Sequence, residues 1–180
     1  MLDNMNYIQQ YDSQDALSLA ASTPEQLSHN FGVRVTRNAS IDTVVFSAMG
    51  GSALQAEFVK TWPHLNVPFI VSKDYNLPEF VNENTLVIVA SYSGNTDETL
   101  SALSQAREKN AQIAIMAGGG TLLEQAEQYG DTFVQVPKAI QPRMAVFYAF
   151  RALIELLVAY EIVETRVIDE LEKIVPSLEA

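Results

Sequence analysis

Short, continuously apolar runs alternate with helical patterns along this 180-residue chain, and this alternation constrains the fold more than any other feature. Runs rich in valine and isoleucine, without polar alternation, are typical of strands covered on both faces. Helices between such runs supply the crossover that parallel strands require. The expected strands span residues 43–49, 68–72, 85–91, 112–117 and 132–136, and the expected helices between them span 52–62, 96–110 and 121–130.

This pattern predicts an α/β fold, a doubly wound five-stranded parallel sheet flanked by helices. A further helix is expected at residues 23–32, with Pro24 in its first turn and Gly32 as its stop. No linker rich in proline, glycine or serine divides the chain, so we expect a single domain. Its expected parts are an N-terminal helical segment (1–40), an α/β core (41–141) and C-terminal helices (142–176).

The amino-acid composition excludes some classes of binding partner and favours one cellular compartment. The chain has 22 acidic and 11 basic residues, a formal charge of −11, so we expect neither nucleic acid nor an anionic membrane as its partner. It has no cysteine, which excludes disulfides, thiolate catalysis and cysteine-ligated zinc. The amino terminus has neither the basic nor the apolar region of a secretory signal. Together these features favour the cytoplasm.

Residues 144–163 form the most apolar stretch and approach the length of a membrane span. Tyr148, Arg151 and Glu155 recur in it at helical spacing, which favours a buried helix with one polar stripe over a membrane span. Such a helix needs apolar cover on most sides, from the sheet and a second subunit or from a further domain. One expectation is therefore a homodimer paired through the C-terminal helices.

Ligands of doubly wound sheets bind at the carboxyl ends of the strands, where this chain has three turns of small residues. In the first turn, "MGGSA", Gly50 and Gly51 allow close backbone approach and Ser52 opens the next helix. The unpartnered N–H groups of that helix start can hold an anion, although Ser52 as an ordinary N-cap is the alternative. The spacing matches neither a dinucleotide fingerprint nor a P-loop. In the turn "AGGGT", residues 118–120 favour simple backbone clearance.

The turn "SYSGNT" carries more hydroxyls. Ser91, Ser93 and Thr96 each offer one O–H donor at the start of the next helix. The ordinary alternative is a capping box formed by Asn95 and Glu98. One cap needs one side chain, so three hydroxyls beside a second glycine-serine turn favour an anion site built from neutral donors.

Four segments, "MGGSA", "DYNLP", "TLVIVASYSGNTDETL" and "QPRMAVFYAF", resemble in order and spacing the amino-terminal half of the bifunctional phosphoglucose/phosphomannose isomerases. Those enzymes are built from sugar isomerase (SIS) domains, and "SYSGNT" by itself indicates only such a domain. The resemblance covers residues from about 25 to the end. It implies a flavodoxin-like SIS domain that takes glucose, mannose or fructose 6-phosphate, with no cofactor and no metal.

The resemblance also implies roles for particular residues. The groups that would hold the sugar phosphate are the Gly51 backbone and the side chains of Ser52, Ser91, Ser93 and Thr96. Arg143 would stabilise negative charge on the enediolate formed during aldose-ketose isomerisation. Pro142 suits the first helical position, which puts Arg143 in a first turn where the helix dipole disfavours a cation. A local rule broken beside a proposed site favours a functional role, and a surface arginine paired with a carboxylate is the alternative.

The sequence departs from the family pattern at Ala48, at residues 55–57 and at Met144. The family also has a second SIS domain, which carries the glutamate that moves the proton and the histidine that assists ring opening. His29, His64 and Glu57 are not expected to replace them, because the histidines follow helix ends and nothing in the sequence raises the pKa of Glu57.

Two functional hypotheses follow. The chain is either a fragment that binds hexose 6-phosphates and lacks the catalytic base, or a self-sufficient single-domain SIS protein. The second class includes an isomerase completed across subunits and a non-catalytic phosphosugar sensor.

Overall fold

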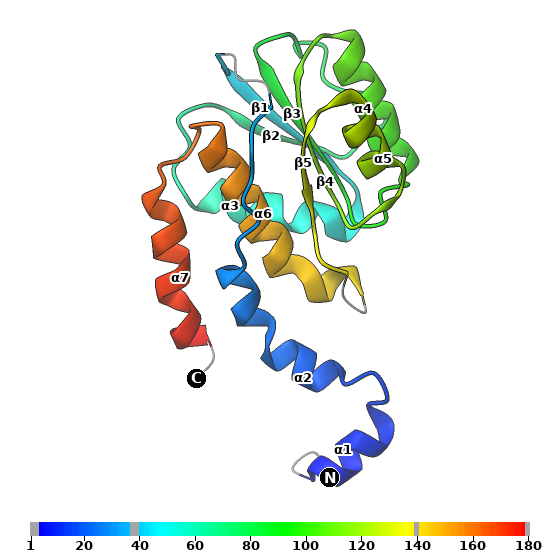
Figure 1. Ribbon diagram of the computed structural model, residues 1–180, viewed down its shortest axis with the longest axis vertical. Helices are drawn as coiled ribbons and strands as arrows, with labels where there is room; N and C mark the ends of the chain where they lie inside the picture. Colours follow the sequence, from blue (N-terminus) through cyan, green and yellow to red (C-terminus); the bar gives the residue numbers. More distant parts are fainter. Residues whose placement is uncertain (1–3, 37–39, 139–140, 179–180) are drawn as a thin grey trace.

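The computed structural model describes residues 4–36, 40–138 and 141–178. Five strands form one parallel sheet in the order β2-β1-β3-β4-β5, with helices on both sides (Figure 1). The five predicted strands are confirmed, each within one residue of the expected bounds. They are β1 (Thr43–Ala48), β2 (Phe69–Ser72), β3 (Thr85–Ser91), β4 (Gln112–Ala117) and β5 (Thr132–Gln135).

The order of the strands reverses at β1. Strand β2 lies on one side of β1 and β3 on the other, and the β1–β3 pairing runs from Thr43 opposite Thr85 to Ala48 opposite Ala90. The turns that follow β1 and β3 therefore leave neighbouring strand ends toward different faces of the sheet. A doubly wound sheet opens its ligand crevice at such a switch point, and here the crevice falls between "MGGSA" and "SYSGNT".

Alternate residues of the central strands point to opposite faces of the sheet. Val45 and Val87 pack in one apolar core, and Phe46 and Ile88 pack in the other. Helices α4 (Asp97–Glu108) and α5 (Gly120–Tyr129) cover the first face, and α3 (Leu54–Thr61) and α6 (Val146–Ala159) cover the second (Figure 1). Helix α7 (Arg166–Leu178) packs against η1 and α6. The edge strand β5 differs from the prediction of cover on both faces, since Phe133 is 40% exposed.

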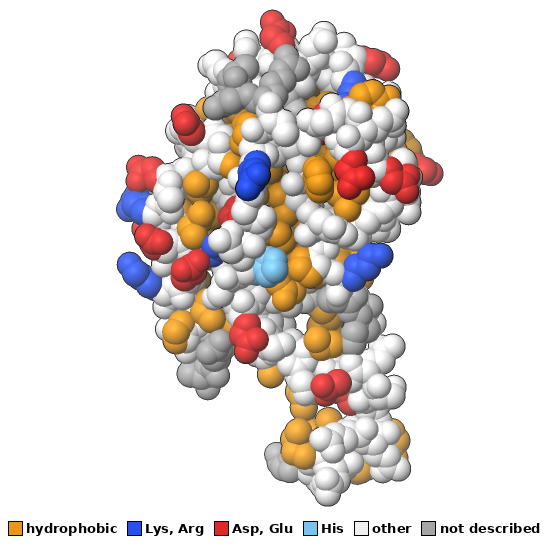
Figure 2. All heavy atoms as spheres, viewed as in Figure 1, with side chains coloured by type: hydrophobic (Ala, Val, Ile, Leu, Met, Phe, Trp, Pro, Cys, Tyr) orange, Lys and Arg blue, Asp and Glu red, His pale blue; other side chains and the backbone are white. Residues whose placement is uncertain are grey.

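The amino-terminal segment contains α1 (Met5–Tyr11), α2 (Ala16–Ala21) and the 3-10 helix η1 (Thr23–Ser28). Helices α1 and α2 extend away from the sheet (Figure 1), and apolar side chains lie on the surface of this extension (Figure 2). The helix expected at 23–32 is shorter than predicted because the backbone becomes extended at His29. The Phe31 N–H then donates to the Glu155 carboxylate instead of to a helical carbonyl.

The carboxyl-terminal region is helical, as predicted, but in three pieces: the 3-10 helix η3 (Pro142–Ala145), α6 and α7. Helix α6 is the buried helix with a polar stripe that the sequence predicts. The Nε of Arg151 donates to Glu155 at 2.8 Å, and its Nη1 donates to the Leu27 carbonyl at 2.8 Å and to Glu172 at 3.1 Å. These contacts tie η1, α6 and α7 together. Within the described ranges, no helix is long and apolar enough to cross a membrane.

Removal of Glu155 tests the importance of this ion pair for stability. Glu155→Ala leaves the buried Arg151 guanidinium with one exposed carboxylate, so we expect the free energy of unfolding to fall by about 3–5 kcal/mol. The control is Glu172→Ala, which removes the exposed partner and should cost less than about 1 kcal/mol. Urea unfolding curves, monitored by circular dichroism, measure both free energies. Equal losses in the two variants would contradict the assignment of Glu155 as the main partner of Arg151.

Candidate functional site

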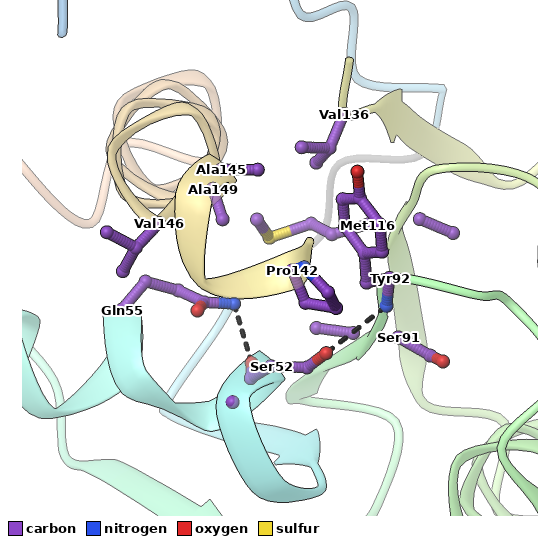
Figure 3. Close-up of a pocket in the computed structure, with 13 residues that line it drawn as sticks. Ser52, Gln55, Ser91, Tyr92, Met116, Val136, Pro142, Ala145, Val146 and Ala149 are labelled. Carbon is purple, nitrogen blue, oxygen red and sulfur yellow. Dashed lines mark hydrogen bonds between the residues drawn. The ribbon is translucent and has the colours of Figure 1, made fainter. Parts of the chain in front are cut away.

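A backbone-to-side-chain hydrogen bond joins the turns after β1 and β3. The Tyr92 N–H donates to the Ser52 Oγ at 3.2 Å, while the Gln55 side-chain amide donates to the Ser52 carbonyl at 2.7 Å (Figure 3). Ser52 lies inside the 3-10 helix η2 (Gly50–Ala53), whose start has no side-chain cap. The alternative of Ser52 as an ordinary N-cap is therefore wrong, because its hydroxyl faces the neighbouring turn.

The three hydroxyls of "SYSGNT" form one cluster. Ser91 Oγ lies 2.8 Å from Thr96 Oγ1 and 3.4 Å from Ser93 Oγ, and the Gly94 N–H donates to Ser91 Oγ at 3.2 Å. Ser91 is buried at the end of β3, whereas Ser93 is exposed and Thr96 half-buried. The contacts between hydroxyls use at most two of the three O–H protons, so the cluster keeps a donor for a ligand.

Asn95 does not form the capping box that was the ordinary alternative for this turn. Its Oδ1 accepts a hydrogen bond from the Thr121 N–H at 3.0 Å, at the start of α5, and the Gly94 carbonyl accepts one from Leu122 at 3.0 Å. Helix α4 begins after Thr96 without a side-chain cap. Its first-turn N–H groups therefore lie beside the hydroxyl cluster without a capping side chain.

The third turn serves backbone clearance, as predicted. A Cβ on Gly94 would collide with the Gly119 carbonyl, and one on Gly120 would press against the Ser93 carbonyl. Both glycines also have positive φ, +74° at Gly94 and +72° at Gly120. The hydroxyl turn is thus seated directly on the start of α5.

A small cavity of about 30 Å³, room for a water or two, lies beside these turns. Figure 3 shows Tyr92, Met116 and Val136 on one side and η3 and the start of α6 on the other. Gly51, Ser52 and Ser91 line it, and Ser93 and Thr96 join through their contacts with Ser91. The described lining residues include no histidine, aspartate or glutamate.

Arg143 lies at the rim and not in the lining. Its neighbour Pro142 and the nearby Ala145 line the cavity, while Arg143 is exposed in η3 and forms no salt bridge with a described residue. The alternative of an arginine paired with a surface carboxylate therefore has no support in the described residues. A cation without such a partner remains available to an anionic ligand.

The other titratable residues considered from the sequence lie outside the lining. Glu57 is held by Lys60 at 2.9 Å and Lys73 at 3.1 Å, and these hydrogen bonds, that of Lys60 first, lower its pKa below the ordinary value. It therefore stays ionised at neutral pH and does not suit proton shuttling. His29 is exposed and packs against the rings of Phe31 and Tyr148.

Sequence reasoning missed two polar side chains of the cavity wall, those of Gln55 and Tyr92. Gln55 is 3% exposed although its side chain is polar. Its place three residues after Ser52, where a helix returns to the same face, is the signal that points to it. Tyr92 lies inside "SYSGNT", where the sequence pattern indicates a role only for the serine and threonine hydroxyls.

Comparison with known proteins assigns the family. The SIS domain family model matches residues 39–160. The chain belongs to the SIS domain family. A bifunctional phosphoglucose/phosphomannose isomerase of Caldicellulosiruptor bescii is 39% identical over 162 residues, which cover 86% of this chain and 48% of that protein. One of Aquifex aeolicus is 38% identical over 117 residues, or 63% of this chain and 37% of that protein.

A solved structure from Bacillus subtilis, described provisionally as a phosphosugar isomerase, superposes with a TM-score of 0.57 at 23% identity. The superposed region covers 89% of this chain and 51% of the solved chain. At this level of identity the similarity supports the fold alone. This SIS chain therefore spans about half the length, or less, of the relatives it matches. The predicted fold and family are confirmed.

The seating of the hydroxyl turn on α5 gives a prediction with a matched control. Gly94→Ala combines a positive φ with a collision against the Gly119 carbonyl, so we expect it to lower the free energy of unfolding by about 3 kcal/mol or more. Gly130→Ala has a similar φ of +70° with open space around it, and should cost only about 1–2 kcal/mol. Urea denaturation of both variants measures the difference. A Gly94→Ala variant as stable as Gly130→Ala would mean that the two turns can separate freely.

Proposed function

We infer that this chain is the phosphosugar-binding SIS domain of a glucose 6-phosphate/mannose 6-phosphate aldose-ketose isomerase. The observation that carries this inference is the gathering of the Ser52, Ser91, Ser93 and Thr96 hydroxyls at the switch point of the sheet, with Arg143 at the rim. The relatives named as phosphoglucose/phosphomannose isomerases support the choice of hexose 6-phosphates.

In this proposal the phosphate is held without an ion pair. The donors are the hydroxyl cluster, the Gly51 backbone and the uncapped first-turn N–H groups of α4. A dianion gains hydrogen bonds and a favourable helix dipole there. Local donors of this kind are needed because the chain as a whole has a charge of −11.

The sugar carbons then extend from the phosphate across Pro142 toward Arg143. Isomerisation moves a proton between C2 and C1 through an enediolate, whose negative oxygens a guanidinium can bind through two parallel N–H bonds. Arg143 supplies this electrostatic stabilisation, and it is the catalytic residue that we assign to this chain.

The proton itself needs a base that the described lining does not contain. We propose that the base and the acid for ring opening come from the second SIS domain that the full-length relatives carry. In the alternative, a second copy of this chain completes the site, or the domain only senses phosphosugars. A homodimer and a cytoplasmic location complete the proposal, and neither a cofactor nor a metal is required.

A thermal-shift experiment tests the phosphate site. Fructose 6-phosphate at about a hundred times its dissociation constant should stabilise the chain by about 2.7 kcal/mol, which raises its melting temperature by several degrees. The Ser93→Ala/Thr96→Ala variant should lose this shift, whereas Ser104→Ala, an exposed serine of α4, should keep it. An unchanged shift in the double variant would show that the hydroxyls serve only the turn itself.

A turnover assay tests the assignment of the base. Glucose 6-phosphate incubated with this chain alone should give no fructose 6-phosphate above the uncatalysed rate, because the described cavity holds no group to move the proton. Formation of the ketose by a coupled spectrophotometric assay would favour the self-sufficient enzyme instead.

A further inference from the structure

The side chain of Gln26, in η1, makes a two-point contact with the segment that carries Arg143. Its Nε2 donates to the Met144 carbonyl at 2.7 Å, and its Oε1 accepts from the Tyr148 N–H at 3.1 Å. Gln26 lies 118 positions before Met144 and 122 positions before Tyr148 in the chain. Gln26 is only 8% exposed, so water does not readily replace either bond.

Both hydrogen bonds satisfy backbone groups at the junction of η3 and α6. The residue before α6, Ala145, has no side-chain cap, and Tyr148 is the third residue of that helix. The Tyr148 N–H therefore has no partner within its own helix, and the Gln26 oxygen caps it from outside. The Met144 carbonyl belongs to η3 itself, so the second bond fixes the short 3-10 turn against η1.

Arg143 is thus held between two restraints. The ring of Pro142 fixes the backbone on one side, and the Gln26 amide grips the carbonyl of Met144 on the other. The Arg143 side chain itself makes no salt bridge with a described residue. With no such partner, the direction of this side chain depends on the backbone that Gln26 and Pro142 hold.

We propose that Gln26 is a positioning residue, which aims Arg143 at the reacting end of a phosphosugar by holding the η3–α6 junction. This inference rests on the function proposed above for Arg143. Gln26 itself does not line the cavity, so it touches no substrate and acts only through the backbone of the segment it grips.

The variant Gln26→Glu isolates the contact with Met144. The carboxylate still accepts from the Tyr148 N–H at the start of α6, where the helix dipole favours a negative charge. The second carboxylate oxygen faces the Met144 carbonyl and has no proton to donate, so the hydrogen bond to η3 is lost. The matched control is Gln105→Glu on the other side of the sheet, where the amide of Gln105 likewise bridges two backbone groups, those of Tyr75 and Leu77.

Two ligands distinguish a loss of Arg143 positioning from a general loss of binding. One is 5-phosphoarabinonate, whose carboxylate imitates the charge of the enediolate, and the other is arabinitol 5-phosphate, which has the same phosphate but no charge at that end. Calorimetric titration of the full chain gives both affinities, and a melting curve of each variant confirms folding. We expect Arg143→Ala to weaken the acid by roughly 10–100-fold and the alcohol by only about twofold.

Gln26→Glu should weaken the acid by roughly tenfold, leave the alcohol within about twofold, and add nothing in a double variant with Arg143→Ala. Gln105→Glu should change neither affinity. If Gln26→Glu weakens both probes equally, or adds its full effect to Arg143→Ala, then Gln26 is structural and the positioning role is wrong. If Arg143→Ala leaves the acid unaffected, the role proposed for Arg143 fails first, and the aiming role fails with it.

Discussion

The pairing of β1 with β3 is the constraint on which the rest of the site depends. These neighbouring parallel strands end together, yet their following helices cover opposite faces of the sheet. The two turns are therefore forced apart around a crevice, and the bond from the Tyr92 N–H to the Ser52 Oγ spans it. A site made of two glycine-serine turns follows from this geometry, because each turn alone would be an ordinary helix start.

The second constraint is the close contact of the hydroxyl turn with α5. Asn95 caps α5 rather than its own helix, and Gly94 approaches the Gly119 carbonyl more closely than any side chain would allow. This contact holds the turn firmly and leaves α4 without a side-chain cap. The same arrangement thus gives rigidity and exposes N–H groups, which is what a site for an anion requires.

Much of this was predictable from the sequence. Continuous apolar runs located the strands, because burial on both faces demands such composition. The hydroxyls of Ser91, Ser93 and Thr96 were predictable from their number, which exceeds the need of one cap. The role of Asn95 as a cap for α5 was not predictable, because its partner Thr121 lies 26 positions along the chain. The same holds for Gln26, whose partners lie more than 100 residues away.

The sequence by itself determined the fold class, the family and the presence of a hydroxyl-rich turn after a buried strand, since periodicity and short motifs are local properties. Only the tertiary structure decided which side chain satisfies which backbone group: Ser52 facing Tyr92, Asn95 capping α5, and Arg151 donating to the Leu27 carbonyl. Hydrogen bonds form between groups that packing brings together, and the distance along the chain does not reveal that neighbourhood.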